Sequence, residues 1–191
     1  EASMGSIYTF HDETDIDAIA EGDRFLVFDT SAGRTKSASG TDLKVWAGAG
    51  GATVSTTATT LSVTQTQHAG RIVRVATTSP VIVTLPAASG TGDTYTFFMA
   101  VAATGTESTI KVANATDVMK GVVWAATTTS DNAEAFITTA TSDSIEMNGT
   151  TKGGVIGDRY ELTDIATGVW SVKGFTAPTG TEATPFDATV S

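Results

Sequence analysis

Short runs in which apolar and polar side chains alternate dominate the chain after residue 60. The clearest run covers residues 81–85, where Val81, Val83 and Leu85 share one face of an extended segment. Proline at position 86 ends this run because it has no N–H to donate to a strand ladder. A glycine-rich loop follows over residues 89–93, and a second alternating run, rich in aromatic residues, occupies residues 94–102. This pattern predicts either a β-hairpin or a corner between two sheets.

Turn residues separate the remaining alternating runs at short and fairly even intervals, which is typical of an all-β sandwich or barrel-like domain. No period is constant along the chain, so the pattern does not predict a solenoid or a propeller. The further expected strands cover residues 60–64, 71–76, 109–113, 121–126, 133–138, 144–148, 159–163 and 169–174.

The first fifty residues predict a small, separate element. Residues 24–29 are almost wholly apolar and predict a strand covered on both faces, and residues 34–39 predict a more polar returning strand. A short helix is expected over residues 43–47, before a glycine run at 48–51 that would serve as a hinge. The chain is thus expected to contain a strand–turn–strand–helix element for attachment or oligomerisation (residues 1–50), a β-sandwich domain (residues 51–176) and an extended C-terminal arm (residues 177–191).

Large apolar side chains in these strands are the expected core, and aromatic residues outside the main strands are the expected subunit interface. The interface candidates are Phe10, Trp46 and Phe186. The core candidates are Phe25, Val27, Phe28, Phe97, Phe98 and Trp170.

Composition narrows the function classes. Hydrophobic residues make up 40% of the 191 residues and charged residues only 17%, while about one residue in five is Thr, which suits strand surfaces. The net charge of -10 argues against binding to nucleic acid or to an anionic membrane surface. The absence of cysteine excludes disulfides, zinc thiolate sites and cysteine nucleophiles. No apolar run approaches a membrane-spanning length, and the first residues carry no secretory signal pattern.

No motif predicts an active site or a cofactor. The two histidines, His11 and His68, have no metal-ligand spacing, and no nucleophile-elbow motif is present. Nothing selects a pair of glycosidase carboxylates among the 21 acidic residues. One acidic cluster has enough oxygen ligands for calcium but lacks the EF-hand spacing, so a solvated helix start is the simpler interpretation. The cluster consists of Asp12, Glu13, Asp15, Asp17, Glu21 and Asp23.

Aromatic residues could form a platform on which sugars stack, although each lies in an apolar run that favours packing in the core or at a subunit interface. They are Trp46, Trp124, Trp170, Tyr95 and Tyr160.

Three segments resemble virion proteins of tailed bacteriophages, especially fibre and head-decoration proteins. They are GDRFLVFDTSAGRTKSASGTDLKVW (residues 22–46), VIVTLPAASGTGDTYTFFMA (residues 81–100) and the ending GTEATPFDATVS (residues 180–191). Proteins of this kind are commonly homotrimers. The resemblance implies a non-enzymatic structural protein on the virion, a trimeric head-decoration (cement) protein whose partners are its own copies and the major capsid protein or other virion proteins.

Two alternatives remain open. The chain could be the receptor-binding part of a tail or head fibre, although it has neither shaft repeats nor coiled-coil heptads. It could also be a carbohydrate-binding adhesin module that binds a host glycan.

Overall fold

The computed structural model describes residues 24–29, 33–39, 53–104, 107–127 and 132–190. The chain divides into two compact units, Glu1–Ala49 and Gly50–Ser191. The boundary between them falls inside the glycine run at residues 48–51.

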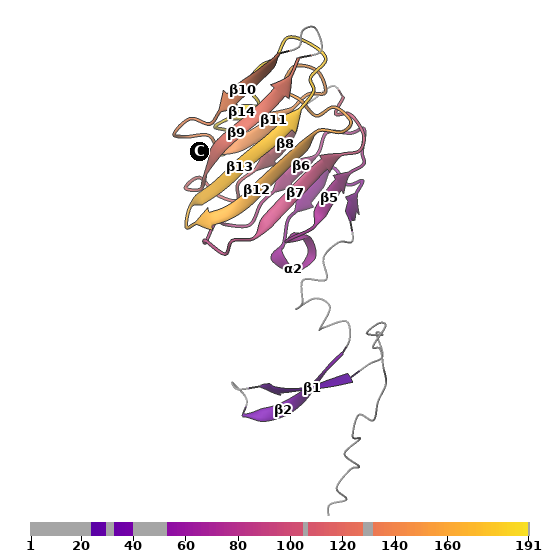
Figure 1. The fold of residues 1–191 in the computed structure, drawn as a ribbon, viewed down its shortest axis with the longest axis vertical. Coiled ribbons are helices and arrows are strands. Elements are labelled where there is room, and N and C mark those ends of the chain that lie inside the picture. Colours follow the sequence, from indigo (N-terminus) through magenta and orange to yellow (C-terminus); the bar gives the residue numbers. More distant parts are fainter. Residues whose placement is uncertain (1–23, 30–32, 40–52, 105–106, 128–131, 191) are drawn as a thin grey trace, which may run out of the picture. The chain divides into compact units, whose positions relative to one another are not determined.

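The smaller unit contains an antiparallel hairpin (Figure 1). Strand β1 (Arg24–Asp29) pairs with β2 (Arg34–Ser39), so that Asp29 lies opposite Arg34. Gly33, at φ 60°, supplies the left-handed backbone that the turn needs. The expected helix over residues 43–47 and the side chains of Phe10, Phe25, Val27, Phe28 and Trp46 lie outside the described part of the structure.

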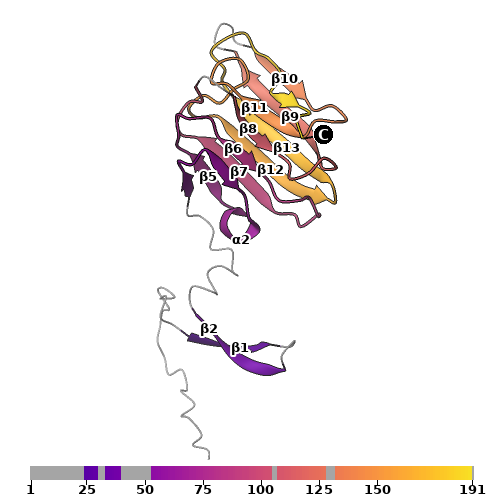
Figure 2. The ribbon, with the colours of Figure 1, turned by 180° about the vertical axis from the view of Figure 1, so that it is seen from behind.

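The larger unit is a sandwich of two mixed β-sheets, which confirms the expected fold class (Figures 1 and 2). The seven-stranded sheet has the order β10 (Ala133–Ile137), β9 (Val118–Ala126), β13 (Val169–Thr176), β12 (Arg159–Ala166), β7 (Thr94–Met99), β5 (Ile72–Val75) and β3 (Val54–Thr56). The five-stranded sheet has the order β14 (Phe186–Asp187), β11 (Ser144–Met147), β8 (Ser108–Lys111), β6 (Ile82–Thr84) and β4 (Thr60–Ser62). One short helix, α2 (Gln65–His68), precedes β5.

From β3 to β8 the chain alternates between the two sheets. Each strand pairs in parallel with the strand that preceded it in the same sheet, β3 with β5, β5 with β7, β4 with β6 and β6 with β8. The proline and the glycine loop between β6 and β7 therefore make a corner between the sheets and not a hairpin. Val54, Val73 and Phe97 are register partners at unequal sequence spacings, which explains why the sequence has no fixed period.

The strands after β8 complete both sheets. β12 pairs antiparallel with β7 and with β13, and β9 pairs in parallel with β13 and antiparallel with the edge strand β10. In the other sheet, β11 pairs antiparallel with β8. All ten strands expected after residue 60 are present, with ends that differ by a few residues, whereas β3, α2 and β14 were not expected.

The C-terminal segment differs from the expected extended arm because it folds onto its own sheet. β14 pairs with β11, and the Asp143 carboxylate accepts hydrogen bonds from the backbone N–H groups of Thr189 and Val190 at 2.8 and 3.2 Å. Phe186, an interface candidate, is only 8% exposed and packs in the core of its own sandwich. Burying the phenylalanine ring against the core favours this folded-back path.

Side chains between the two sheets form a continuous core. Phe97 and Trp170 are buried as expected, and the rings of Tyr95 and Trp170 meet edge to face with centroids 5.7 Å apart. Phe98 was also expected in the core but is only half-buried, on the outer face of the seven-stranded sheet. Adjacent residues of a strand point to opposite faces, so Phe98 must point outward once Phe97 points inward.

Candidate interaction surface

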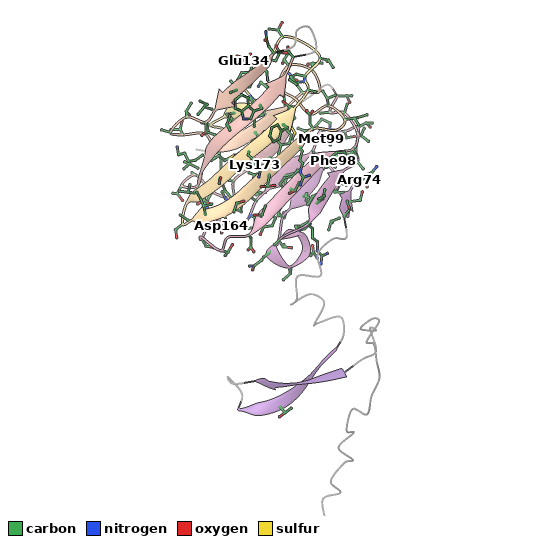
Figure 3. The ribbon with its side chains drawn as sticks, viewed as in Figure 1. Arg74, Phe98, Met99, Glu134, Asp164 and Lys173 are labelled. Atoms are coloured by element: carbon green, nitrogen blue, oxygen red, sulfur yellow. The ribbon has the colours of Figure 1, made fainter. Side chains whose placement is uncertain are left out.

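The outer face of the seven-stranded sheet carries a line of arginine and aromatic side chains across five adjacent strands. Figure 3 labels two of its members, Arg74 and Phe98. Register pairing links them from strand to strand. In spatial order the line contains Arg74 on β5, Phe98 on β7, Arg159 on β12, Phe175 on β13 and Trp124 on β9. We call these five residues the arginine–aromatic row.

Much of the apolar surface in this row faces solvent. Phe175 is 63% exposed and Trp124 is 44% exposed. On the same outer face, Ile72 on β5 is 40% exposed and Ile137 on β10 is 73% exposed. Contiguous exposed apolar surface of this kind on a folded domain is typical of an interaction site.

A second register row runs beside the first and carries an ion pair. Lys173 Nζ on β13 lies 2.8 Å from Glu161 Oε1 on the neighbouring β12. The lysine side chain is 63% exposed, so solvent screens the pair and it adds little stability. Its effect is to neutralise Lys173, which leaves the two arginines of the first row as the dominant charges beside it.

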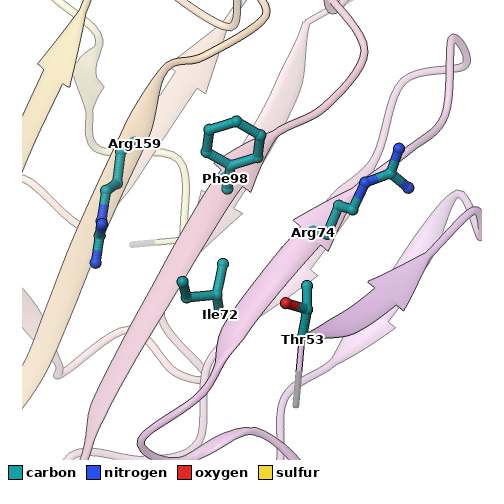
Figure 4. A pocket seen from close by; sticks show the side chains of 5 residues that line it. All are labelled: Thr53, Ile72, Arg74, Phe98 and Arg159. Atoms are coloured by element: carbon teal, nitrogen blue, oxygen red, sulfur yellow. The ribbon is translucent and has the colours of Figure 1, made fainter. Parts of the chain in front are cut away.

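Two shallow hollows flank Arg159. The first, of about 360 Å³, is lined by Thr53, Ile72, Arg74, Phe98 and Arg159, and Figure 4 shows Ile72 and Phe98 between the two arginine side chains. The second, of about 280 Å³, is lined by Arg159, Glu161, Lys173 and Phe175. Arg159 therefore has an aromatic ring and a hollow on each side of it along the row.

These residue types determine what the surface can do. A guanidinium group offers five donors in a planar fork that fits a carboxylate, and aromatic rings supply rigid apolar area. Phe, Trp and Arg are the residue types enriched at the centres of protein–protein interfaces. Among residues 53–104, 107–127 and 132–190, no group of three or more His, Cys, Asp or Glu side chains could hold a metal ion.

The most buried carboxylates serve the fold and not this surface. The Asp164 carboxylate, near the end of β12, accepts backbone N–H bonds from Ser89, Gly90 and Thr91, the shortest from Gly90 at 2.7 Å. Burial acts to raise the pKa of Asp164, but these hydrogen bonds outweigh it and lower the pKa below the ordinary value. The charged carboxylate thereby fixes the glycine loop that joins the two sheets.

Asp158 has a similar structural role just before β12. Its carboxylate accepts N–H bonds from Gly154, Val155 and Ala177 at 2.8 to 3.0 Å. Burial raises the pKa of Asp158, although the hydrogen bonds from Ala177, Val155 and Gly154 oppose the rise. With its oxygens occupied by backbone donors, Asp158 ties the turn before β12 to the end of β13.

Of the five aromatic residues proposed from sequence as a sugar-stacking platform, the four that the structure describes do not share one exposed surface. Tyr95, Tyr160 and Trp170 are buried in the core. Trp124 reaches the surface, where its aromatic neighbour in the register is Phe175.

The other sequence candidates lie elsewhere. His68 is buried at the end of α2, where its Nδ1 accepts the Thr64 N–H at 3.0 Å. His11, the acidic cluster from Asp12 to Asp23, Phe10 and Trp46 fall outside the described residues.

The arginine–aromatic row was not predicted from the sequence because its members are far apart in the chain. The available signal was local: each member sits next to a buried residue, as Arg74 lies between Val73 and Val75. That alternation shows that each side chain faces outward, but only the strand order aligns the five of them.

The part of the chain that the structure describes contains no helix long and apolar enough to cross a membrane. No protein family, no curated protein and no solved structure matches this chain.

Proposed function

We propose that this chain is a non-enzymatic structural protein of a tailed-phage virion, a trimeric head-decoration protein that binds its own copies and the major capsid protein. The resemblance of three segments to virion proteins suggests the class. The arginine–aromatic row is the observation that carries the proposal, because it exposes on one sheet face the residue types that are enriched at protein–protein interfaces.

The energetic argument starts from Phe175 and Trp124, which both leave apolar surface in water. Covering each 100 Å² of apolar area contributes on the order of 2.5 kcal/mol before the entropic cost of association. Sheet residues lose little freedom on binding because their backbones are already ordered. The complex in which a partner protein covers the row is therefore stabilised. A decoration protein would strengthen a shell in this way.

The charge of the row favours a three-fold assembly over a two-fold one. A two-fold dimer centred on the row would bring Arg159 against the Arg159 of its partner, and this like-charge contact disfavours such a dimer. A heterologous contact brings the row against a different surface of the neighbour, and such contacts close into rings such as trimers. The chain as a whole carries a net charge of -10, so acidic surface is plentiful.

The test measures the mass of the purified full chain by light scattering and its binding to emptied phage particles that lack it. A trimer that binds particles is expected. The double variant Trp124→Ser/Phe175→Ser should lose binding, whereas Ile82→Ser, which removes an equally exposed side chain from the other sheet, should retain it. A monomer with no affinity for particles would overturn the proposal.

A carbohydrate-binding adhesin module is the second candidate. It is favoured by the exposed ring of Phe175 beside the hollow at Arg159, an arrangement on which a sugar ring could stack. Binding on a glycan array that is lost in Phe175→Ser, together with no binding to particles, would put this candidate first.

A fibre tip would instead be located on the tail or on a head fibre by immunogold labelling of virions.

A further inference from the structure

We propose that the arginine–aromatic row binds an acidic, extended polypeptide segment of the partner protein, with Arg74 and Arg159 each taking one carboxylate. This inference rests on the proposed function in one respect: the partner is another virion subunit.

Both arginines have unused binding capacity. Arg74 Nη1 donates to Ser55 Oγ on the neighbouring strand at 3.2 Å. Among the described residues, the ion pairs are those of Lys152 with Glu107 and Glu146 and of Lys173 with Glu161. Neither arginine is therefore paired with a described carboxylate, and each guanidinium can offer a fork of N–H donors to a ligand.

The spacing of the two arginines suits an extended chain that crosses the strands. They are register partners of Phe98 from either side, so their backbones are two strand spacings apart, about 9.6 Å. A polyproline II segment brings every third residue to the same side at intervals of about 9.3 Å. Carboxylates three residues apart on such a segment would meet Arg74 and Arg159, and the stretch of chain between them would pass over Phe98.

The surroundings favour a polypeptide over other anions. Outward positions near the arginines carry apolar side chains, Ile72, Phe98, Phe175 and Trp124, which match an acidic segment that also contains aliphatic residues. The described outward positions of these strands hold no Asn or Gln, the amides that commonly orient sugar hydroxyls. Nucleic acid needs many basic contacts along its backbone, whereas the row offers only two arginines.

The experiment titrates the full chain against a fluorescein-labelled peptide of four Asp-Pro-Ile repeats, followed by anisotropy and by backbone NMR shifts. The control peptide replaces every Asp with Asn. We expect the Asp peptide to bind, to weaken as salt is raised, and to shift resonances on β5, β7, β12 and β13. The Asn peptide should bind at least about tenfold more weakly, because it loses both charge-assisted contacts.

Variants locate the site. Arg74→Glu/Arg159→Glu should abolish binding, and Arg159→Lys should weaken it several-fold, because lysine keeps the charge but loses the fork. Lys111→Glu is the matched control: it reverses a charge on the five-stranded sheet and should bind as the parent does. The unfolding temperature of every variant is measured as a control. A value close to that of the parent establishes that the variant is folded.

The remaining outcomes separate this inference from the proposed function. Equal binding of the Asp and Asn peptides, or loss of binding in Lys111→Glu, would overturn an acidic ligand at the row. Binding of an oligouronate in place of the peptide would also overturn an acidic polypeptide ligand and would identify an anionic glycan as the ligand. If Arg74→Glu/Arg159→Glu still forms trimers and binds particles, the inference fails and the proposed function stands. If the parent binds the Asp peptide but neither trimerises nor binds particles, the inference stands and the proposed function fails.

Discussion

A β-carbon at Gly121 would lie only 1.7 Å from the carbonyl oxygen of Val172. The two residues are register partners on the parallel strands β9 and β13, and Gly121 has φ +155°. Its N–H also donates to Thr138 Oγ1 at 3.0 Å, and its carbonyl accepts the Thr138 N–H at 3.1 Å. The strand that carries Trp124 therefore reaches its place in the seven-stranded sheet only because residue 121 has no side chain.

We expect Gly121→Ala to destabilise the sandwich by about 3 kcal/mol or more, because the contact is with backbone that cannot move aside. Gly92→Ala is the control, since Gly92 also has a positive φ of +78° but has open space around it. That variant should cost only about 1–2 kcal/mol of backbone strain. Urea unfolding followed by tryptophan fluorescence measures the unfolding free energy of both variants. Equal losses of stability in the two variants would contradict the close approach of Gly121 to Val172.

Truncation of Phe97 should destabilise the fold much more than truncation of Phe98. Phe97 is fully buried between the sheets, so Phe97→Ala should cost about 3–5 kcal/mol through lost burial and a residual cavity. Phe98 is half-buried on the outer face, so Phe98→Ala should cost about 1 kcal/mol and act mainly on partner binding. Equal losses in the urea unfolding free energy would mean that Phe98 belongs to the core after all.

Asp164 should make stability depend on pH in the acid range. Its lowered pKa means that the folded state favours the charged carboxylate. The resulting stabilisation is present above the unfolded pKa of about 3.9 and is lost as the pH falls through the lower folded value. Asp164→Asn should cost about 1.5–3 kcal/mol at neutral pH, and this cost should shrink at lower pH.

The control for this experiment is Glu134→Gln, which neutralises an exposed carboxylate on the edge strand β10. It should leave the urea midpoint almost unchanged at neutral pH. A difference between Asp164→Asn and the parent that stays constant as the pH falls would show that the loop does not depend on the charge.

Tyr160 carries a buried hydroxyl that makes no well-formed hydrogen bond among the described residues. Burial, with a further contribution from Asp158, raises the pKa of this group well above its ordinary value, so the hydroxyl stays protonated. The backbone N–H of Gly154 approaches this hydroxyl and opposes the rise in its pKa, but the same N–H donates to the Asp158 carboxylate at 2.8 Å. Tyr160→Phe removes an unsatisfied polar group at almost constant volume. Thermal unfolding should show unchanged or higher stability, by up to about 1 kcal/mol, and a clear loss would reveal a bound water as the missing partner.

Local patterning accounts for most of the fold that sequence could predict. Alternation in the runs around Val73, Phe97 and Trp170 identifies strands and their buried faces, because side chains of a strand alternate between its two sides. Alternation also places Phe98 on the outer face, and only its aromatic character suggested the core. At Phe186 the aromatic side chain alone did not reveal which subunit covers it. Alternation did not predict β14, which is only two residues long and is defined by its pairing with β11.

The arginine–aromatic row could not be predicted in the same way. Arg74, Phe98, Arg159, Phe175 and Trp124 come from five strands whose spatial order differs from their order in the chain. Whether Arg159 lies beside Phe98 depends on long-range pairing between β12 and β7, and no pattern within one strand encodes that pairing.

Residue types and neighbours along the chain are enough to establish the all-β class, the positions of most strands, the strongly acidic charge and the lack of thiol chemistry. Three features require the folded sandwich: which outward side chains share a surface, how the C-terminal segment folds back, and where glycine is required. These features depend on hydrogen bonds and packing between residues far apart in the sequence, and such contacts form only when the two sheets come together.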